Sequence, residues 1–249
     1  MEQAHRDGSR AATWRRWEPL TGIAFIALFI TGFLMNNSPN PDQSNAIWTS
    51  YFADKGNRVL ITISGFILVA SGVCLLAFLT TVWQRIAAAR RPAATSPVGV
   101  VTAAVAAAAI MIGGVGMAVV TGSMLFGNLA EPGPDTLRLA NDMGFPFIAV
   151  AGMFAASLSV GALSVQAYSA GILGRRLLTL GLVVAVGLLA SAFFFPMVLL
   201  LVWTAVITTV LVRRGADADE AAALDERLST QLSGSATRAP NSAATPAAR

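Results

Sequence analysis

The residues best suited to chemistry lie in or directly beside two short polar segments, 37–57 and 126–141, which separate long apolar stretches. They combine carboxylates, cations and one tryptophan: Trp48, Asp54, Lys55, Arg58, Glu131, Asp135, Arg138 and Asp142. If both segments reach one face of a membrane, these side chains could form a small site for a ligand or a partner protein. The alternative interpretation is that Asp135 and Asp142 cap helices, while the arginines pair with nearby acids or phospholipid head groups.

The sequence has few residues that could serve as a nucleophile with its base or as metal ligands. There is one histidine, His5, in the polar N-terminal segment, and one cysteine, Cys74, inside an apolar stretch. One histidine cannot hold a haem between two histidines, and a single cysteine cannot form a cysteine-based metal site. His5 lies in the tail and not in a span, so an intramembrane Ser–His pair is also excluded. We therefore predict no catalytic residue, no metal and no cofactor, and we expect a protein that is not an enzyme. A pair of carboxylates beside an outer cleft would revive the enzyme hypothesis.

The elements that must position these residues are long apolar helices, because 55% of the residues are hydrophobic and only 12% are charged. An apolar run of about 18 or more residues has no polar face for water and predicts a membrane-spanning helix. We predict an all-α polytopic membrane protein with six transmembrane helices in one bundle. The spans are expected at about 19–36, 59–84, 98–125, 143–167, 177–194 and 196–212. Residues 1–16 and 215–249 would be tails, the second disordered, around a membrane domain at 17–214.

Several residues predict where helices begin and end. Asn36 and Asn37 should end the first span, and Ser44 should cap a short interfacial helix that carries Trp48 and runs to about Ala53. Asp135 is expected to cap one helical turn and Asp142 to cap the fourth span, with Pro146 in the first turns of that span. An unbroken helix over 177–212 would hold Pro196 in its interior, so we expect two spans there, separated at 193–196.

Basic residues indicate the orientation of the chain. Eleven arginines flank the spans on the side of the N-terminus, against three basic residues in the opposite loops, Lys55, Arg58 and Arg138. Such a bias predicts that both termini are cytoplasmic. The candidate outer-face polar cluster is then Trp48, Asp54, Arg58, Asp135, Arg138 and Asp142. Because the basic residues mark topology, the net charge of +4 does not predict nucleic acid as a partner; we expect a bacterial plasma membrane protein.

Small residues recur at spacings that suit close helix packing. The candidates are Gly113, Gly116, Gly152, Ala156, Gly181 and Ala185, together with Trp203 near the middle of the last span. They could form a face for dimerisation or a substrate cleft, or serve ordinary packing within one bundle. The indole N–H of Trp203 should find an acceptor on a neighbouring helix. The centres of the spans carry no ionisable group of the kind that ion-coupled carriers use.

Three features together resemble a known group of proteins. They are Trp17-Glu18-Pro19-Leu20-Thr21-Gly22-Ile23 at the first span, Asp54-Lys55-Gly56-Asn57-Arg58 before the second, and Trp203 in the last. Over about residues 14–214 the chain resembles the uncharacterised six-span integral membrane proteins of actinobacteria, grouped as domains of unknown function. It departs from that group before the fifth span, where it has Gly174-Arg175-Arg176 in place of a Pro-Arg-Trp turn. The resemblance implies six spans and carries over no activity, cofactor or functional residue.

These observations favour a non-enzymatic accessory or structural component that associates with other membrane proteins. Its partners would be the lipid bilayer and another membrane protein or a second copy of itself. The alternative is a small permease or channel for a neutral or apolar solute, which needs no intramembrane charge. A continuous polar cavity between the spans would favour the alternative, and a dry, tightly packed centre would count against it.

Overall fold

The computed structural model describes residues 18–89, 96–127, 130–191 and 196–214, and every regular element within them is helical. The interpretations of the two tails, of the basic loop at 90–92 and of the break at 193–195 fall outside these residues. The elements are η1 (Glu18–Leu20), α2 (Thr21–Met35), α3 (Asn45–Ala53), α4 (Lys55–Ala89), α5 (Val98–Phe126), α6 (Pro134–Pro146), η3 (Phe147–Gly152), α7 (Met153–Ser169), α8 (Arg175–Leu188) and a last helix, Met197–Arg214. The chain divides into two units, residues 1–208 and 209–249, and all packing described below lies within the first unit.

Five helical stretches among the described residues are long and apolar enough to cross a membrane. They are Glu18–Met35, Lys55–Ala89, Val98–Phe126, Pro134–Ser169 and Met197–Arg214. The prediction of an all-helical protein with several apolar spans is thus confirmed in its coarse form. Helix α8 has 14 residues, which is shorter than the other candidates. The end of the first span also agrees with the sequence, because Asn36 is the C-cap of α2.

The fourth span departs from the prediction, because α6, η3 and α7 follow one another without a break from Pro134 to Ser169. Gly133 is the N-cap and Pro134 the first residue, where a missing N–H costs no hydrogen bond. Asp135 therefore lies in the first turn, where its charge suits the helix dipole, and is not the cap. Asp142 lies two turns inside the helix, so the prediction that it caps a span is wrong.

Pro146 lies within this long helix and not in its first turns. A proline cannot donate the usual hydrogen bond to the carbonyl four residues earlier. The six residues that follow, Phe147–Gly152, form a wider π-helical segment before regular α-helix resumes at Met153. The π-helical segment therefore begins directly after Pro146, which has no backbone N–H to donate.

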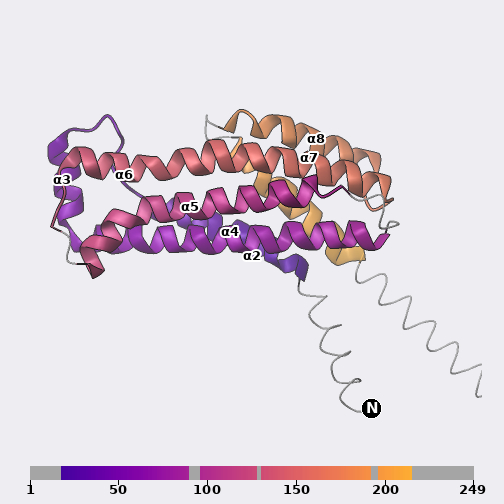
Figure 1. Ribbon diagram of the computed structural model, residues 1–249, viewed down its shortest axis with the longest axis horizontal. Helices are drawn as coiled ribbons and strands as arrows, with labels where there is room; N and C mark the ends of the chain where they lie inside the picture. Colours follow the sequence, from indigo (N-terminus) through magenta and orange to yellow (C-terminus); the bar gives the residue numbers. More distant parts are fainter. Residues whose placement is uncertain (1–17, 90–95, 128–129, 192–195, 215–249) are drawn as a thin grey trace, which may run out of the picture. The chain divides into compact units, whose positions relative to one another are not determined.

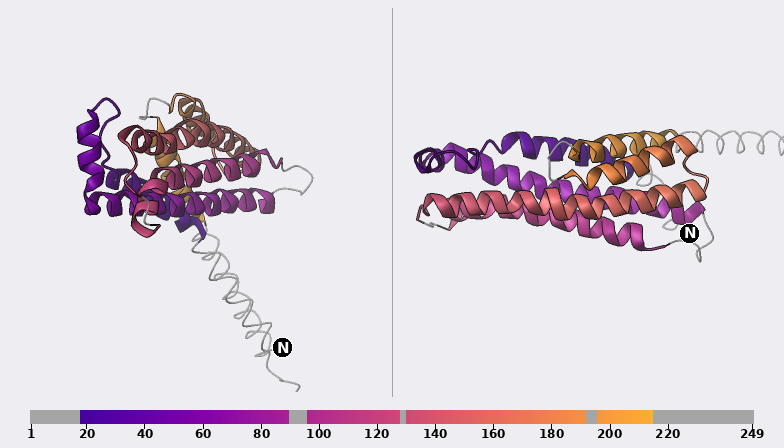
Figure 2. Two further views of the ribbon diagram at one scale, coloured as in Figure 1. Left: turned by 60° about the vertical axis from the view of Figure 1, so that its left-hand side comes forward. Right: turned by 90° about the horizontal axis from the view of Figure 1, so that it is seen from above.

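Consecutive helices pack antiparallel, as Figures 1 and 2 show for α4, α5 and the α6–α7 stretch. Two crossings bring backbones together. A Cβ added at Gly65 would lie 2.5 Å from the Gly114 carbonyl oxygen of α5, and one added at Gly144 would lie 2.5 Å from the Gly113 carbonyl oxygen. Both crossings need glycine, since any side chain would push the helices apart.

Helix α8 is tied to the α6–α7 stretch by two serine hydroxyls. Ser157 donates to the Ala185 carbonyl at 2.6 Å, and Ser191 donates to the carbonyl of Ala149 in the π-helical segment at 2.5 Å. The last helix packs against α8 in turn, because a Cβ added at Gly187 would overlap the side chain of Leu199. These contacts place α8 between α7 and the last helix.

Candidate functional site

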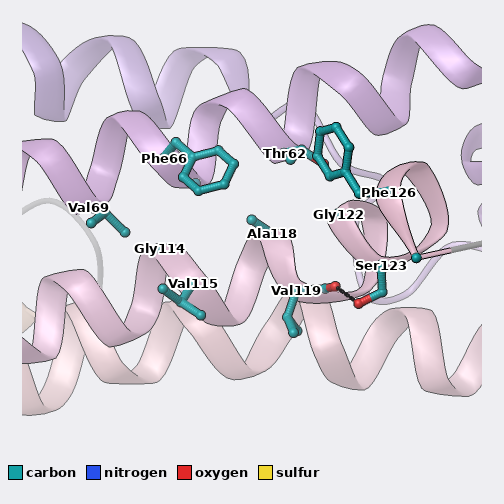
Figure 3. Close-up of a pocket in the computed structure, with 12 residues that line it drawn as sticks. Thr62, Phe66, Val69, Gly114, Val115, Ala118, Val119, Gly122, Ser123 and Phe126 are labelled. Atoms are coloured by element: carbon teal, nitrogen blue, oxygen red, sulfur yellow. Dashed lines mark hydrogen bonds between the residues drawn. The ribbon is translucent and has the colours of Figure 1, made fainter.

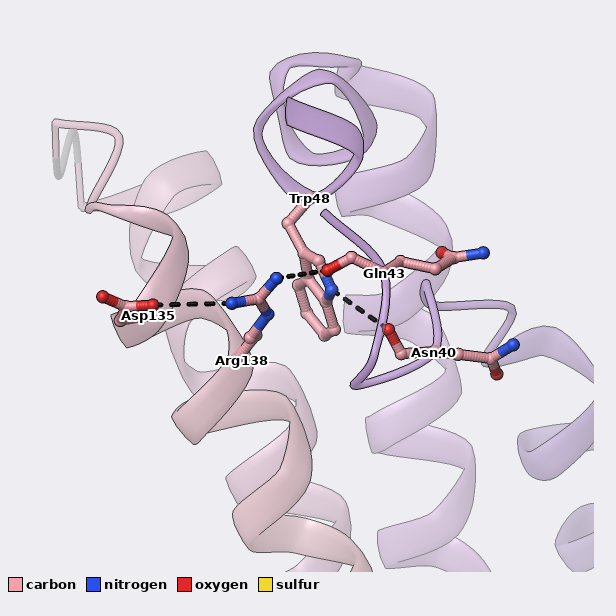
Figure 4. Close-up of polar contacts among 5 residues, drawn as sticks. All are labelled: Asn40, Gln43, Trp48, Asp135 and Arg138. Atoms are coloured by element: carbon pink, nitrogen blue, oxygen red, sulfur yellow. Dashed lines mark hydrogen bonds and ion pairs between the residues drawn. The ribbon is translucent and has the colours of Figure 1, made fainter. Parts of the chain in front are cut away.

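Arg138 joins the start of α6 to the chain around α3, as Figure 4 shows. Its guanidinium donates to the Gln43 carbonyl oxygen and forms an ion pair of 3.5 Å with Asp135 one turn earlier. The same group lies 5.7 Å from the centroid of the Trp48 ring, within the range of a cation–π interaction. The indole N–H of Trp48 donates to the Asn40 carbonyl at 3.2 Å. We call these five residues, Asn40, Gln43, Trp48, Asp135 and Arg138, the α3 cap.

Trp48 is the centre of an apolar cluster and not a residue of an interfacial belt. It is fully buried and stacks on Phe52, with ring centroids 5.7 Å apart. Ile61, Met124 and Leu137 complete the cluster from α4, α5 and α6. The side chain of Trp48, expected at the membrane interface, packs inward together with Phe52, whereas Ile47 is 44% exposed. Residues 48 and 52 share one helix face, and that face packs inward. Ser44 is the N-cap residue of α3, as predicted, and its backbone carbonyl accepts the first bonds of the helix, but its side chain makes no capping hydrogen bond.

The other members of the predicted polar cluster have local roles. Asp54 accepts the backbone N–H groups of Gly56 at 2.6 Å and Asn57 at 3.1 Å, and so stabilises the start of α4. Asp142 accepts from the amide of Asn141 at 3.4 Å. Arg58 is half-buried, and its Nε has no partner among the described residues. The structure thus brings together Trp48, Asp135 and Arg138, and leaves Asp54 and Asp142 with their sequence neighbours.

Tyr51 lies beside the α3 cap and has a perturbed hydroxyl. Its side chain is half-buried and its hydroxyl oxygen has no hydrogen-bond partner in the described part of the chain. Burial raises the pKa of the Tyr51 hydroxyl above its usual value of 10.0, and the negative charge of Asp54 raises this pKa further. Within the described residues no group of three or more His, Cys, Asp and Glu side chains could hold a metal ion.

An apolar groove of about 430 Å³ opens between α4 and α5, shown in Figure 3. Its residues are uncharged and come only from these two helices and the residue after α5: Thr62, Gly65, Phe66, Val69, Gly114, Val115, Ala118, Val119, Gly122, Ser123, Phe126 and Gly127. Phe66 is 63% exposed and Phe126 78% exposed, so the groove faces outward and not into the bundle. Such a surface can take an alkyl chain or the side chains of another helix, and it offers no nucleophile with a base.

Glycines shape this groove in two ways. Gly65 and Gly114 let the two backbones touch, which forms its floor, and the hydroxyls of Thr62 and Thr121 share a hydrogen bond of 2.8 Å nearby. Gly122 is different, because a Cβ added there would meet only the Thr62 methyl at 3.7 Å. The sequence shows where the small residues lie but not which of them are covered by a neighbouring helix. The groove was therefore not predicted from the sequence.

The seven candidate packing residues contact helices of the same chain. Gly113 and Gly116 approach Gly144 of α6, and Gly152 approaches Ala109 of α5. Ala156 is fully buried and Ala185 lies opposite Gly161, 3.5 Å from a Cβ placed there. A Cβ added at Gly181 would overlap the Ser164 hydroxyl. These contacts favour the interpretation of ordinary packing within one bundle.

Trp203 is 1% exposed and packs edge-on against Phe78, with ring centroids 6.2 Å apart. The acceptor predicted for its indole N–H is not found among the described residues, since the nitrogen has no partner there.

Comparison of the chain with protein-family models, with curated proteins and with solved structures finds no match to any of them. The length and apolar character of five helices among the described residues define the class: an all-helical, multi-pass membrane protein.

Proposed function

We propose that this protein is a non-enzymatic membrane component that associates with another membrane protein through the groove between α4 and α5. One observation carries the proposal: an uncharged apolar groove of about 430 Å³ lies on the outer surface of two spanning helices. In a bilayer, burial of apolar surface provides little free energy for helix association, because lipid is equally apolar. A groove with small residues at its floor allows close packing, and it therefore favours a specific partner helix. Figure 3 shows Phe66 and Val119 beside this groove.

The interior of the bundle supports this proposal over a solute pathway. Large side chains of α2 and α4 pack inward: Phe25, Leu68, Leu75 and Phe78 are all fully buried, and Phe78 packs against Trp203 of the last helix. At the crossings of α4 with α5 and of α5 with α6 the backbones themselves are in contact. A centre packed in this way leaves little room for a continuous polar route.

Six spans with both termini in the cytoplasm form the second part of the proposal. Contacts pair Ser164 of α7 with Gly181 at the middle of α8, and Ala149 with Ser191 three residues beyond the end of α8. The 14 residues of α8 correspond to about 21 Å of helix, against a hydrocarbon core of about 30 Å. Because α8 follows α7 over most of that depth, we count it as a span, and the excess of arginines then orients both termini inward.

A site-specific photocrosslinker tests the proposed association. A benzophenone side chain placed at Val119, which is 50% exposed in the groove, should crosslink the full-length protein to a membrane partner in its native membranes. The matched control is Val186 of α8, which is 69% exposed and outside the groove. Mass spectrometry would identify a stoichiometric partner from position 119 only. Crosslinks to lipid alone from both positions would contradict the proposal.

Single cysteines test the orientation separately. Cys74 is first replaced by alanine, which leaves no other cysteine in the chain. Thr49→Cys in α3 and Gly174→Cys before α8 are both at exposed positions. We expect an impermeant maleimide to label position 49 in intact cells, and position 174 only after the membrane is opened. The reverse pattern would overturn the orientation without affecting the groove.

A permease for a neutral solute is the second candidate function. Several buried, uncharged polar groups favour it, among them Ser164, Trp203 and Thr204, because such groups could bind a passing neutral molecule. Purified protein in liposomes distinguishes the two candidates. Movement of a neutral solute by the protein alone would refute the accessory role and support this alternative.

A further inference from the structure

Most hydroxyl groups in the long helices of this protein have partners, whereas three buried ones, Ser164, Thr204 and Thr208, have none among the described residues. Nine donate to a carbonyl of their own helix one turn earlier: Thr62, Ser64, Ser71, Thr81, Thr102, Thr121, Ser123, Ser169 and Thr179. Three more donate to a neighbouring helix: Ser157, Ser159 and Ser191. This is the expected behaviour, because a polar group left unpaired in an apolar interior costs about 1–3 kcal/mol.

Ser164 of α7 is an exception, although it is completely buried and could bond its own helix in the same way. Its hydroxyl has no partner among the described residues. It is directed across the helix interface, because it would overlap a Cβ placed on Gly181 of α8.

The indole nitrogen of Trp203 meets the same point from the last helix. It lies 3.4 Å from the position of a Cβ on Gly181, is 1% exposed, and has no acceptor in the described part of the chain. Phe78 packs edge-on against the Trp203 ring and limits its rotation. Three helices thus direct a hydroxyl, a glycine backbone and an indole N–H to one buried place.

The chemistry of these groups defines what they can bind. The indole N–H only donates, while the Ser164 hydroxyl both donates and accepts. The stretches around them, 153–169, 177–188 and 197–212, carry no Asp, Glu, Lys, Arg or His, and the ionisable residues nearest to Gly181 in sequence are Arg175 and Arg176 at the start of α8. The site itself therefore offers no charged side chain to a ligand. A small neutral oxygen atom that accepts from Trp203 and bonds to Ser164 satisfies both groups. We propose that Ser164, Gly181 and Trp203 form a buried hydration site in which one ordered water molecule bridges the indole and the hydroxyl.

NMR on the full chain tests the proposal directly. With ¹⁵N-labelled tryptophan in detergent micelles, the loss of one peak in Trp203→Phe assigns the Trp203 indole proton. We expect a cross-peak between that proton and water. Trp48 is the matched control, because it is also fully buried but donates to a backbone carbonyl of the protein. A Trp203 indole proton with no more contact with water than that of Trp48 would overturn the proposal.

The unfolding equilibrium constant of Ser164→Ala, compared with that of the native protein, gives an independent test, because the two alternatives predict changes in opposite directions. If Ser164 binds the bridging water, the variant loses that bond, and its unfolding equilibrium constant should rise about three- to tenfold. If the hydroxyl is unpaired, its removal leaves the constant unchanged or lowers it. Ser157→Ala calibrates the assay, because it removes an existing bond to the Ala185 carbonyl in the same pair of helices. A Ser164→Ala variant at least as stable as the native protein would refute the hydration site.

Discussion

Gly65 offers the sharpest test of how the two helices that form the groove are packed. An alanine Cβ there would lie 2.5 Å from the Gly114 carbonyl oxygen and 2.5 Å from the Ala118 Cβ. Both distances are about 0.9 Å inside the 3.4 Å at which ordinary van der Waals contact begins. Neither neighbour can rotate away, since one atom is backbone and the other is fixed to it. The methyl group can be accommodated only if α4 and α5 separate.

Two opposing effects determine how much Gly65→Ala changes the free energy of unfolding. Overpacking of this kind costs about 1–3 kcal/mol, whereas exchanging glycine for alanine within a helix gains up to about 1 kcal/mol. Gly122→Ala is the matched control, because it has the same helical gain but meets only the Thr62 methyl at 3.7 Å. The two variants should therefore differ by about 1–3 kcal/mol in the free energy of unfolding, with Gly65→Ala the less stable.

Reversible unfolding in mixed micelles with increasing SDS measures this difference. Gly114→Ala should resemble Gly65→Ala, since its Cβ would lie 2.7 Å from the Gly65 carbonyl oxygen. The double variant should lose less than the sum of the single losses, because helices already separated by one methyl group accept the second more easily. Equal stability of Gly65→Ala and Gly122→Ala would refute the reasoning.

The remaining predictions concern the α3 cap and its surroundings. Arg138→Met should lower the free energy of unfolding by about 1–3 kcal/mol, because it removes a charge-assisted bond to the Gln43 carbonyl and the contact with Trp48. Asp135→Asn should change little, since its side chain is 89% exposed, so equal losses in the two variants would contradict this assignment. Tyr51 should make the protein less stable as the pH rises above 10.0, because the unfolded chain then releases the tyrosine proton while the raised pKa keeps it on the folded protein. Thermal unfolding between neutral and alkaline pH, compared with Tyr51→Phe, would show a steeper loss in the native protein.

The positions of the long helices could be predicted from sequence because each depends on a local property. Hydropathy over a window of one span's length locates the helices, and Asn36 ends α2 where a short polar side chain follows an apolar run. The role of Asp142 could not be obtained in this way. Both Pro134 and Asp142 are plausible starts for a helix, and only the observed continuity of α6 with α7 decides between them.

Burial of Trp48 shows a second limit of sequence reasoning. A tryptophan in a short polar segment between two spans fits an interfacial belt, and that pattern is correct for many membrane proteins. Here Trp48 is covered because α4 and α6 begin at Lys55 and Pro134 and supply Ile61 and Leu137 to pack against it. The pairing of Arg138 with Gln43, 95 positions away, likewise depends on tertiary structure. Polar residues could be selected from the sequence, but which of them meet could not.

Glycines illustrate why spacing alone does not locate a functional surface in such a protein. Gly65, Gly122 and Gly181 are equivalent in sequence terms, yet a Cβ would meet backbone at the first, only the Thr62 methyl at the second and the Ser164 hydroxyl at the third. A glycine already covered by a neighbouring helix is needed for the fold and cannot be used to test partner binding, because its replacement disturbs both. Gly122 is the exception in the groove, since a Cβ there would make only an ordinary van der Waals contact with the Thr62 methyl. Gly122→Leu should therefore abolish crosslinking from Val119 while the protein unfolds as the native chain does. Retained crosslinking would mean that the partner contacts the rim of the groove and not its floor.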